Sequence, residues 1–158
     1  METISSELME FLQCAEKNRL RYLVIGGHAV NFYGYHRFTE DFDIWIAPTN
    51  ENKKSFLHTL KCLEYNKEDL QLIEAEDFTK HFKCTIGTPP DLIDVLTIVH
   101  KDISYDVAEK NRELIFIQKD IPIYFISFED LKEIKIRSQR PKDWEDITKL
   151  ELLRKNNK

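Results

Sequence analysis

The order of hydrophobic patterns along the chain predicts an α+β fold, in which helices flank a mixed β-sheet. Apolar residues recur with a helical period near both ends of the chain, and short runs rich in β-branched and aromatic residues lie between Arg21 and Ile126. Helices and strands alternate at first, and several strands then precede two helices, as in an α/β mixed sheet. At 158 residues we expect a single domain over residues 1–158.

In the first part of the chain each expected element has its own signal. Leu8, Phe11, Leu12 and Ala15 lie at positions i, i+3, i+4 and i+7, so residues 6–18 are expected to form an amphipathic helix. The elements expected next are a buried strand at 21–25, a glycine break at 26–27, a short helix at 28–33, a strand at 41–46 and a helix capped by Thr49.

In the second part the signals are mostly those of strands and turns. Residues 66–80 are weakly patterned, and no element is predicted there. The elements that follow are strands at 82–86 and 91–99 around a turn at 87–90, a helical turn at 103–111, a hairpin of 113–118 and 121–126, a helix opened by Ser127, and a last helix from Pro141 to about Lys155.

Composition and charge exclude several classes of protein. No stretch approaches the about 18 apolar residues of a membrane span, and the acidic start is unlike a signal peptide. Cys14, Cys62 and Cys84 form no CxxC pair, so we expect reduced thiols in a cytoplasmic protein. The net charge of −5 argues against a general nucleic-acid binder, although the part from Lys132 onward holds nine Lys/Arg and five Asp/Glu.

The Gly26-Gly27 step lies where a predicted strand passes into a predicted helix. Glycines allow a ligand to approach the backbone, and the N–H groups at a helix start attract phosphate. Taken alone, the same pattern is also typical of an ordinary turn.

Three aspartates form the most informative pattern in the chain. Asp41 and Asp43 lie two apart on a predicted strand, so both carboxylates point to the same face. Asp94 interrupts a later apolar strand, where an unpaired carboxylate would be costly. Asp91 is the competing candidate, but it lies at the start of that strand beside Pro90. Repelling carboxylates need a cation, and Mg²⁺ prefers oxygen ligands.

Together these motifs resemble the DNA polymerase beta-like nucleotidyltransferase superfamily. The chain is most similar to minimal nucleotidyltransferases and AbiEii-type abortive-infection toxins, over roughly residues 20–155. The residues that carry this resemblance are Gly26-Gly-His-Ala29, Arg37-Phe-Thr-Glu-Asp-Phe-Asp43, the lone Asp94, and Arg140-Pro-Lys-Asp-Trp-Glu-Asp146. Many members carry Gly-Ser at the first turn, whereas Gly27 offers only its backbone N–H.

The resemblance implies a nucleotidyltransferase fold with flanking and C-terminal helices, and a set of roles for individual residues. Asp41, Asp43 and Asp94 would be catalytic and would bind one or two Mg²⁺. The residues that would contact the NTP are Gly26, Gly27, His28, Arg37, Thr39, Lys135, Arg140 and Lys142.

The last helix adds two carboxylates whose role stays open. Asp143 and Asp146 share a face with Ile147 and Leu150. They either complement the helix dipole or pair with Arg140, Arg37 or Lys135 and hold these cations toward phosphates. Trp45 and Trp144 are expected in the core rather than as base-stacking platforms, and Lys135 either snorkels or serves the site.

The function that we expect is Mg²⁺-dependent transfer of NMP from an NTP to an acceptor hydroxyl. The acceptor hypotheses are a tRNA, a protein or a small molecule. The alternative is an inactive binding module that kept the fold, such as a toxin–antitoxin partner or a nucleotide sensor. A chain of 158 residues leaves little room for an acceptor domain, so a homodimer partner or a second protein is a candidate for completing the site.

Overall fold

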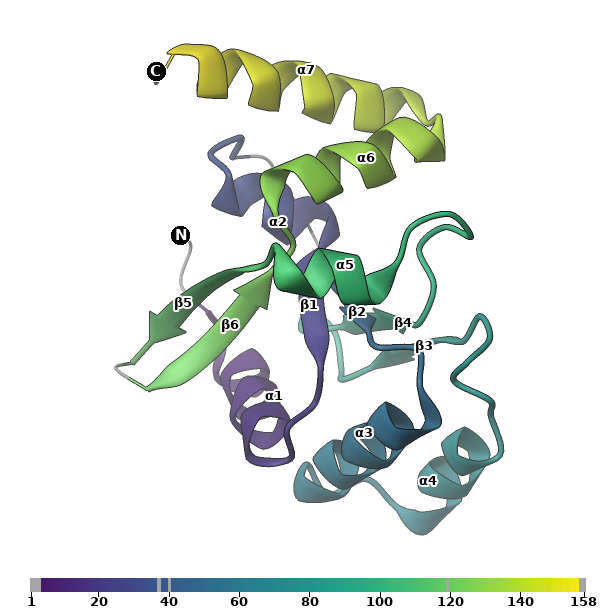
Figure 1. Cartoon of the computed structure of the whole chain (residues 1–158). Coiled ribbons are helices and arrows are strands. Elements are labelled where there is room, and N and C mark those ends of the chain that lie inside the picture. Colours follow the sequence, from purple (N-terminus) through teal and green to yellow (C-terminus); the bar gives the residue numbers. More distant parts are fainter. Residues whose placement is uncertain (1–3, 37, 40, 119, 157–158) are drawn as a thin grey trace.

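The computed structural model describes residues 4–36, 38–39, 41–118 and 120–156, and it confirms the predicted α+β fold class (Figure 1). One mixed six-stranded sheet has the strand order β3-β4-β2-β1-β6-β5. Its strands are β1 (Tyr22–Ile25), β2 (Phe42–Ile46), β3 (Lys83–Ile86), β4 (Ile93–Leu96), β5 (Glu113–Ile117) and β6 (Ile121–Phe125). The pairs β1–β6 and β2–β4 are parallel, and the pairs β1–β2, β3–β4 and β5–β6 are antiparallel.

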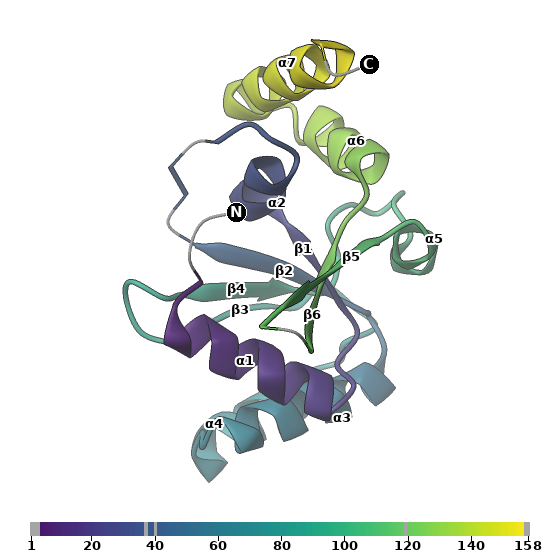
Figure 2. The same ribbon diagram turned by 90° about the vertical axis from the view of Figure 1, so that its left-hand side faces the viewer.

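Helices cover both faces of the sheet (Figure 2). On one face lie α1 (Ser6–Lys17), α3 (Asn50–Cys62) and α4 (Lys67–Glu74). On the other face lie α2 (Gly26–Phe32) and α6 (Phe128–Ser138), with α7 (Pro141–Asn156) packed on the outside of α6, and α5 (Tyr105–Lys110) lies to one side. The sheet is therefore a central layer, and its second face is where the C-terminal helices approach.

The central strand β1 and two helix caps form as the sequence predicts. Every residue of β1 is buried, because helices cover both faces of this strand. The hydroxyl groups of Thr49 and Ser127 accept hydrogen bonds from the backbone N–H groups of Asn52 and Asp130, so both predicted caps are present. These caps fix where α3 and α6 begin.

Several elements differ from the expectation. Strand β2 begins at Phe42, so Asp41 lies just before the strand on which it was expected. Helix α2 begins at Gly26 rather than at residue 28, because the glycines form its first turn. Strand β4 covers only Ile93–Leu96 of the expected 91–99, since Thr88 to Asp91 form a turn. Helix α4 lies in the segment where no element was predicted, and the side chain of Asn66 caps it by accepting the N–H of Asp69.

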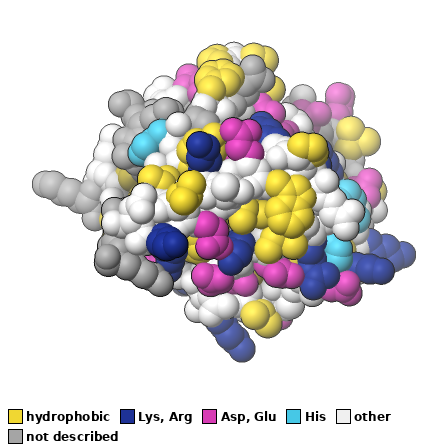
Figure 3. Space-filling view, turned by 90° about the horizontal axis from the view of Figure 1, so that it is seen from above, with side chains coloured by type: hydrophobic (Ala, Val, Ile, Leu, Met, Phe, Trp, Pro, Cys, Tyr) yellow, Lys and Arg dark blue, Asp and Glu magenta, His cyan; other side chains and the backbone are white. Residues whose placement is uncertain are grey.

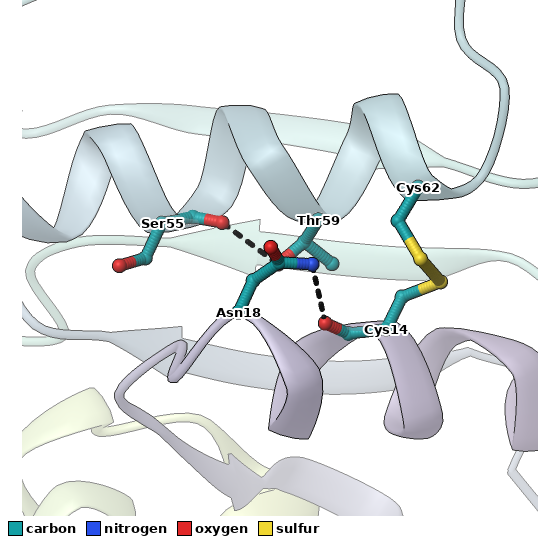
Figure 4. Close-up of a disulfide and its surroundings, with 5 residues drawn as sticks. All are labelled: Cys14, Asn18, Ser55, Thr59 and Cys62. Atoms are coloured by element: carbon teal, nitrogen blue, oxygen red, sulfur yellow. Dashed lines mark hydrogen bonds between the residues drawn. A yellow bond between two sulfur atoms is a disulfide. The ribbon is translucent and has the colours of Figure 1, made fainter.

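The expectation of reduced thiols is wrong for two of the three cysteines. Cys14 on α1 and Cys62 on α3 form a disulfide with their Cα atoms 5.9 Å apart, and Cys84 is free (Figure 4). The two residues are 48 positions apart in sequence, and only the packing of α1 against α3 brings them together. Next to the bridge, Asn18 donates a hydrogen bond to the carbonyl oxygen of Cys14 at 2.8 Å.

The predicted inner face of the last helix is present. Asp143, Asp146, Ile147 and Leu150 are all buried on α7. Of the two tryptophans, Trp45 lies in the core, whereas Trp144 is 49% exposed, so its expected burial is wrong. Trp144 lies at the edge of the contact between the two helices, where it lines a shallow pocket together with Phe128 and Lys132 of α6. Within the described residues, no helix is long and apolar enough to cross a membrane.

Candidate active site

The centre of the site is a row of residues that crosses the sheet. Asp43 on β2 pairs in register with Ile25 on β1 and with Asp94 on β4. Asp94 in turn pairs with Thr85 on β3, whose hydroxyl donates a hydrogen bond of 2.6 Å to Asp94 Oδ1. The carboxylates of Asp43 and Asp94 are thus neighbours on one face of the sheet.

The two carboxylates repel each other, and the repulsion changes the chemistry of Asp43. Burial and the negative charges of Asp94 and Asp41 raise the pKa of Asp43 to about 6, while Lys83 acts in the opposite direction. An ionised Asp43 beside an ionised Asp94 is therefore disfavoured unless positive charge lies between them.

Both glycines are needed where they lie. Gly26 has φ +68°, which favours glycine, and a Cβ at this position would overlap the carboxylate of Asp43. A Cβ at Gly27 would overlap the side chain of Thr39. The backbone that connects β1 to α2 therefore lies against Asp43 and Thr39, which a side chain at either position would prevent.

The start of α7 and the end of α6 are held together by a buried polar network. Lys135 is 5% exposed, and its Nζ lies 2.9 Å from Asp143 Oδ1 and 3.0 Å from Asp146 Oδ2. Asp143 Oδ2 also accepts hydrogen bonds from Ser138 Oγ at 2.5 Å and from Arg140 Nε at 2.8 Å. Burial alone would raise the pKa of Asp143, but the hydrogen bonds from Ser138 and Lys135 lower it below its ordinary value. The network keeps Asp143 ionised.

Two adjoining pockets meet at Asp41 and Asp43. The first, which we call the glycine pocket, has a volume of about 350 Å³ and contains Gly26, Gly27, Phe38, Thr39, Asp41, Asp43, Lys135, Arg140, Lys142 and Asp143. The second, the Asp94 pocket, has a volume of about 490 Å³ and shares six of these residues, Gly26, Asp41, Asp43, Lys135, Arg140 and Asp143. It adds Asp94, with the cationic or titratable side chains of Lys83, His100 and Arg137.

Most of the site residues expected from sequence lie in these pockets. Asp94 joins Asp41 and Asp43, whereas the competing Asp91 does not line either pocket. His28 packs against Phe42, with ring centroids 5.0 Å apart, and lines a separate pocket of about 200 Å³. Arg37 lies outside the described residues.

Several residues of the site were not expected from sequence. Phe38, Lys83, Thr85 and Ser138 carry no motif of their own. Thr85 lies two residues from Lys83 on β3, so the alternation of the strand places both on the same side of the sheet. The positions of Phe38 and Ser138 depend on how a loop and two helices pack against the sheet.

The donor set fits a hard cation. Asp43 and Asp94 offer carboxylate oxygens from neighbouring strands, and Asp41 lines the same pocket, all with the oxygen chemistry that Mg²⁺ prefers. Among the described residues, no three His, Cys, Asp or Glu side chains are already grouped so that they could hold a metal ion. The residues that would hold a cation are Asp43 and Asp94 on neighbouring strands, with Asp41 at the same pocket.

Several cations of the C-terminal part are paired with nearby acids. Lys132 pairs with Glu151, and Arg137 pairs with Glu133 at 2.7 Å. Figure 3 shows the face of the molecule seen from above, where acidic, basic and hydrophobic side chains are interspersed. The positive balance of this part therefore forms no continuous basic surface on that face.

One comparison with known proteins gives a match over nearly the whole chain. A family model described as "Nucleotidyltransferase of unknown function (DUF6036)" matches residues 2–157. No curated protein matches the chain.

Proposed function

The chain belongs to this family of nucleotidyltransferases, and on that premise we propose that it transfers NMP from an NTP to an acceptor hydroxyl with the help of Mg²⁺. The observation that carries the proposal is the junction at Asp41 and Asp43. On one side lies a pocket with two glycines and three cations, and on the other lies a pocket with Asp94. A reaction that joins two substrates at one phosphorus atom needs such an arrangement.

The glycine pocket is the proposed site of the triphosphate. Lys135 uses two of its three N–H donors for Asp143 and Asp146, which leaves one for a phosphate oxygen. Arg140 contacts Asp143 through Nε while its side chain is 74% exposed, so its terminal nitrogens can reach into the pocket. Lys142 adds a further positive charge. We propose that Arg37 and Thr39 also contact the nucleotide, as the motif resemblance implies.

Asp41, Asp43 and Asp94 are the proposed ligands of one or two Mg²⁺. Bound there, Mg²⁺ would stabilise charge on the attacking and leaving oxygens of an in-line displacement. Asp94 is also placed to accept the proton of the acceptor hydroxyl as the bond from that oxygen to the α-phosphorus forms. The bond between the α-phosphorus and the bridging oxygen then breaks, and pyrophosphate leaves past Lys135, Arg140 and Lys142.

The acceptor is proposed from resemblance. The similarity to AbiEii-type toxins makes the 3′ end of a tRNA or a protein side chain the first acceptors to test, with small molecules third. We propose the cytoplasm as the compartment, since NTPs and Mg²⁺ are available there. We also propose that a homodimer partner or a neighbouring protein contributes acceptor contacts.

The experiment is a transfer assay with each NTP labelled at the α-phosphate. The protein is incubated with Mg²⁺ and, separately, with tRNA, cell lysate proteins and aminoglycosides. We expect label in one acceptor class, loss of the label with Asp43→Ala, and its retention with Asp91→Asn. Transfer that persists in Asp43→Ala would refute the mechanism. Mg²⁺-dependent NTP binding without transfer to any acceptor would instead favour the alternative, a nucleotide-binding module such as a sensor or a toxin–antitoxin partner.

A further inference from the structure

We propose that Phe38 is the stacking platform for the nucleobase of the bound nucleotide. This inference rests on the proposed function. It assigns a binding residue to the nucleobase, which is the part of the NTP that the cations of the glycine pocket do not hold. Phe38 lines that pocket and is 81% exposed, the largest fraction among the exposed large hydrophobic side chains of the described residues.

The position of Phe38 follows from its neighbour. Thr39 packs against Gly27, where a Cβ would overlap its side chain, and its hydroxyl donates to the carbonyl oxygen of Asp41 at 3.4 Å. Thr39 thus fixes the chain against the start of α2, and Phe38 lies one residue away from this anchor, at the same pocket. An aromatic ring is therefore placed beside the glycines while most of its surface stays in water.

The side chains of the glycine pocket suit two different parts of a nucleotide, the triphosphate and the base. Lys135, Arg140 and Lys142 suit the charged triphosphate, but none of them offers an apolar surface of ring shape. A nucleobase is flat and mostly apolar on its faces, and stacking on an aromatic side chain is favourable for every base. Phe38 is the only aromatic residue among the described residues that line the glycine pocket.

This assignment also predicts the specificity. A phenylalanine ring has no donor or acceptor with which to read the edge of a base. Stacking tolerates any base and favours those with larger ring systems. We therefore expect weak discrimination among NTPs, with purine nucleotides bound more tightly than pyrimidine nucleotides.

The test compares calorimetric binding of ATP, UTP and inorganic tripolyphosphate, each with Mg²⁺. Phe38→Ala is expected to weaken ATP binding by roughly 10- to 100-fold, as loss of one stacked base predicts, and to leave tripolyphosphate binding unchanged within about twofold. Phe38→Trp is expected to keep or strengthen ATP binding. The matched control is Phe116→Ala, since Phe116 is 61% exposed on β5 and lines neither pocket of the site.

The outcomes separate this inference from the function on which it rests. If wild-type protein binds tripolyphosphate and Phe38→Ala leaves ATP binding intact, the stacking role is refuted while the phosphate pocket stands. An equal loss for ATP and tripolyphosphate in Phe38→Ala also refutes stacking, because the substitution then disturbs the pocket as a whole. If wild-type protein binds neither ligand, the proposed function fails and the inference fails with it.

Discussion

Asp43 on β2 and Asp94 on β4 are in register on neighbouring parallel strands, at the junction of the glycine pocket and the Asp94 pocket. Two carboxylates in this position repel each other and destabilise the protein, and a bound cation would relieve that repulsion. The same pair therefore links folding stability to the proposed chemistry.

Replacing Asp43 by Asn is expected to stabilise the metal-free protein at pH 7. The pKa of Asp43 is raised from 3.8 to about 6, so between these values the folded state keeps a proton that the unfolded state has lost. Stability therefore falls as the pH rises through this window, and the full penalty is present above about pH 6. We expect Asp43→Asn to recover roughly 1–2 kcal/mol at pH 7, after discounting for partial exposure of the site.

Urea unfolding in EDTA from pH 4 to pH 8 measures this effect. The stability of the wild type relative to Asp43→Asn should decline between about pH 4 and pH 6 and then level off. Added Mg²⁺ should stabilise the wild type and not the variant. Parallel pH profiles of the two proteins would show that Asp43 is not perturbed.

Replacing Lys135 by Met is expected to destabilise the fold by about 3 kcal/mol, because it removes the buried cation that pairs with both Asp143 and Asp146. Lys142→Met is the matched control, since Lys142 lines the same pocket but is exposed. This control should unfold within about 0.5 kcal/mol of wild type while weakening NTP binding. Equal stability of the two variants would mean that the buried pairs contribute little.

Gly26→Ala and Gly34→Ala distinguish backbone strain from contact with the site. Both glycines have positive φ, +68° and +108°, so each substitution should cost about 1 kcal/mol of stability. A Cβ at Gly26 would overlap the carboxylate of Asp43, whereas at Gly34 the nearest atom is Leu153 Cδ1 at 3.8 Å. We expect only Gly26→Ala to lower Mg²⁺-dependent NTP binding, and equal binding by both variants would contradict the close approach.

Reduction of the Cys14–Cys62 disulfide is expected to lower stability by about 4 kcal/mol, since it frees a loop of 48 residues in the unfolded chain. Thiol titration under denaturing conditions should find Cys84 alone before reduction and all three cysteines after it. Cys62→Ser should unfold like the reduced wild type. Cytosolic thiols are usually kept reduced. If the protein lies in the proposed compartment, alkylation in intact cells should therefore modify Cys14 and Cys62 as free thiols.

The fold was predictable where the signal is local. The period of Leu8, Phe11 and Leu12 and the caps at Thr49 and Ser127 depend only on nearby residues, and each element that they indicate is present. Helix α4 was missed because it has only eight residues and its apolar face, with Leu70 and Ile73, is only partly buried, so its pattern is short. The disulfide was missed because its two halves meet only through the packing of α1 on α3.

Strand geometry was enough to predict the carboxylates of the site, but not the residues that a helix and a loop bring to it. The spacing of Asp41 and Asp43 and the apolar surroundings of Asp94 indicate one shared face, and the register brings Asp43 and Asp94 together. His28 lies elsewhere, because its position on α2 brings the imidazole against the ring of Phe42. Phe38 depends on the path of a loop, which no periodic pattern encodes.

We propose that the three carboxylates and the glycine pocket together bind a nucleotide through Mg²⁺. Calorimetric titration of a non-hydrolysable ATP analogue, with Mg²⁺ and with EDTA, tests it most directly on wild type, Asp41→Ala/Asp43→Ala and Asp91→Asn. We predict binding by wild type and Asp91→Asn only when Mg²⁺ is present, and none by the double variant. Binding that is equal in EDTA, or equal in the double variant, would contradict the account.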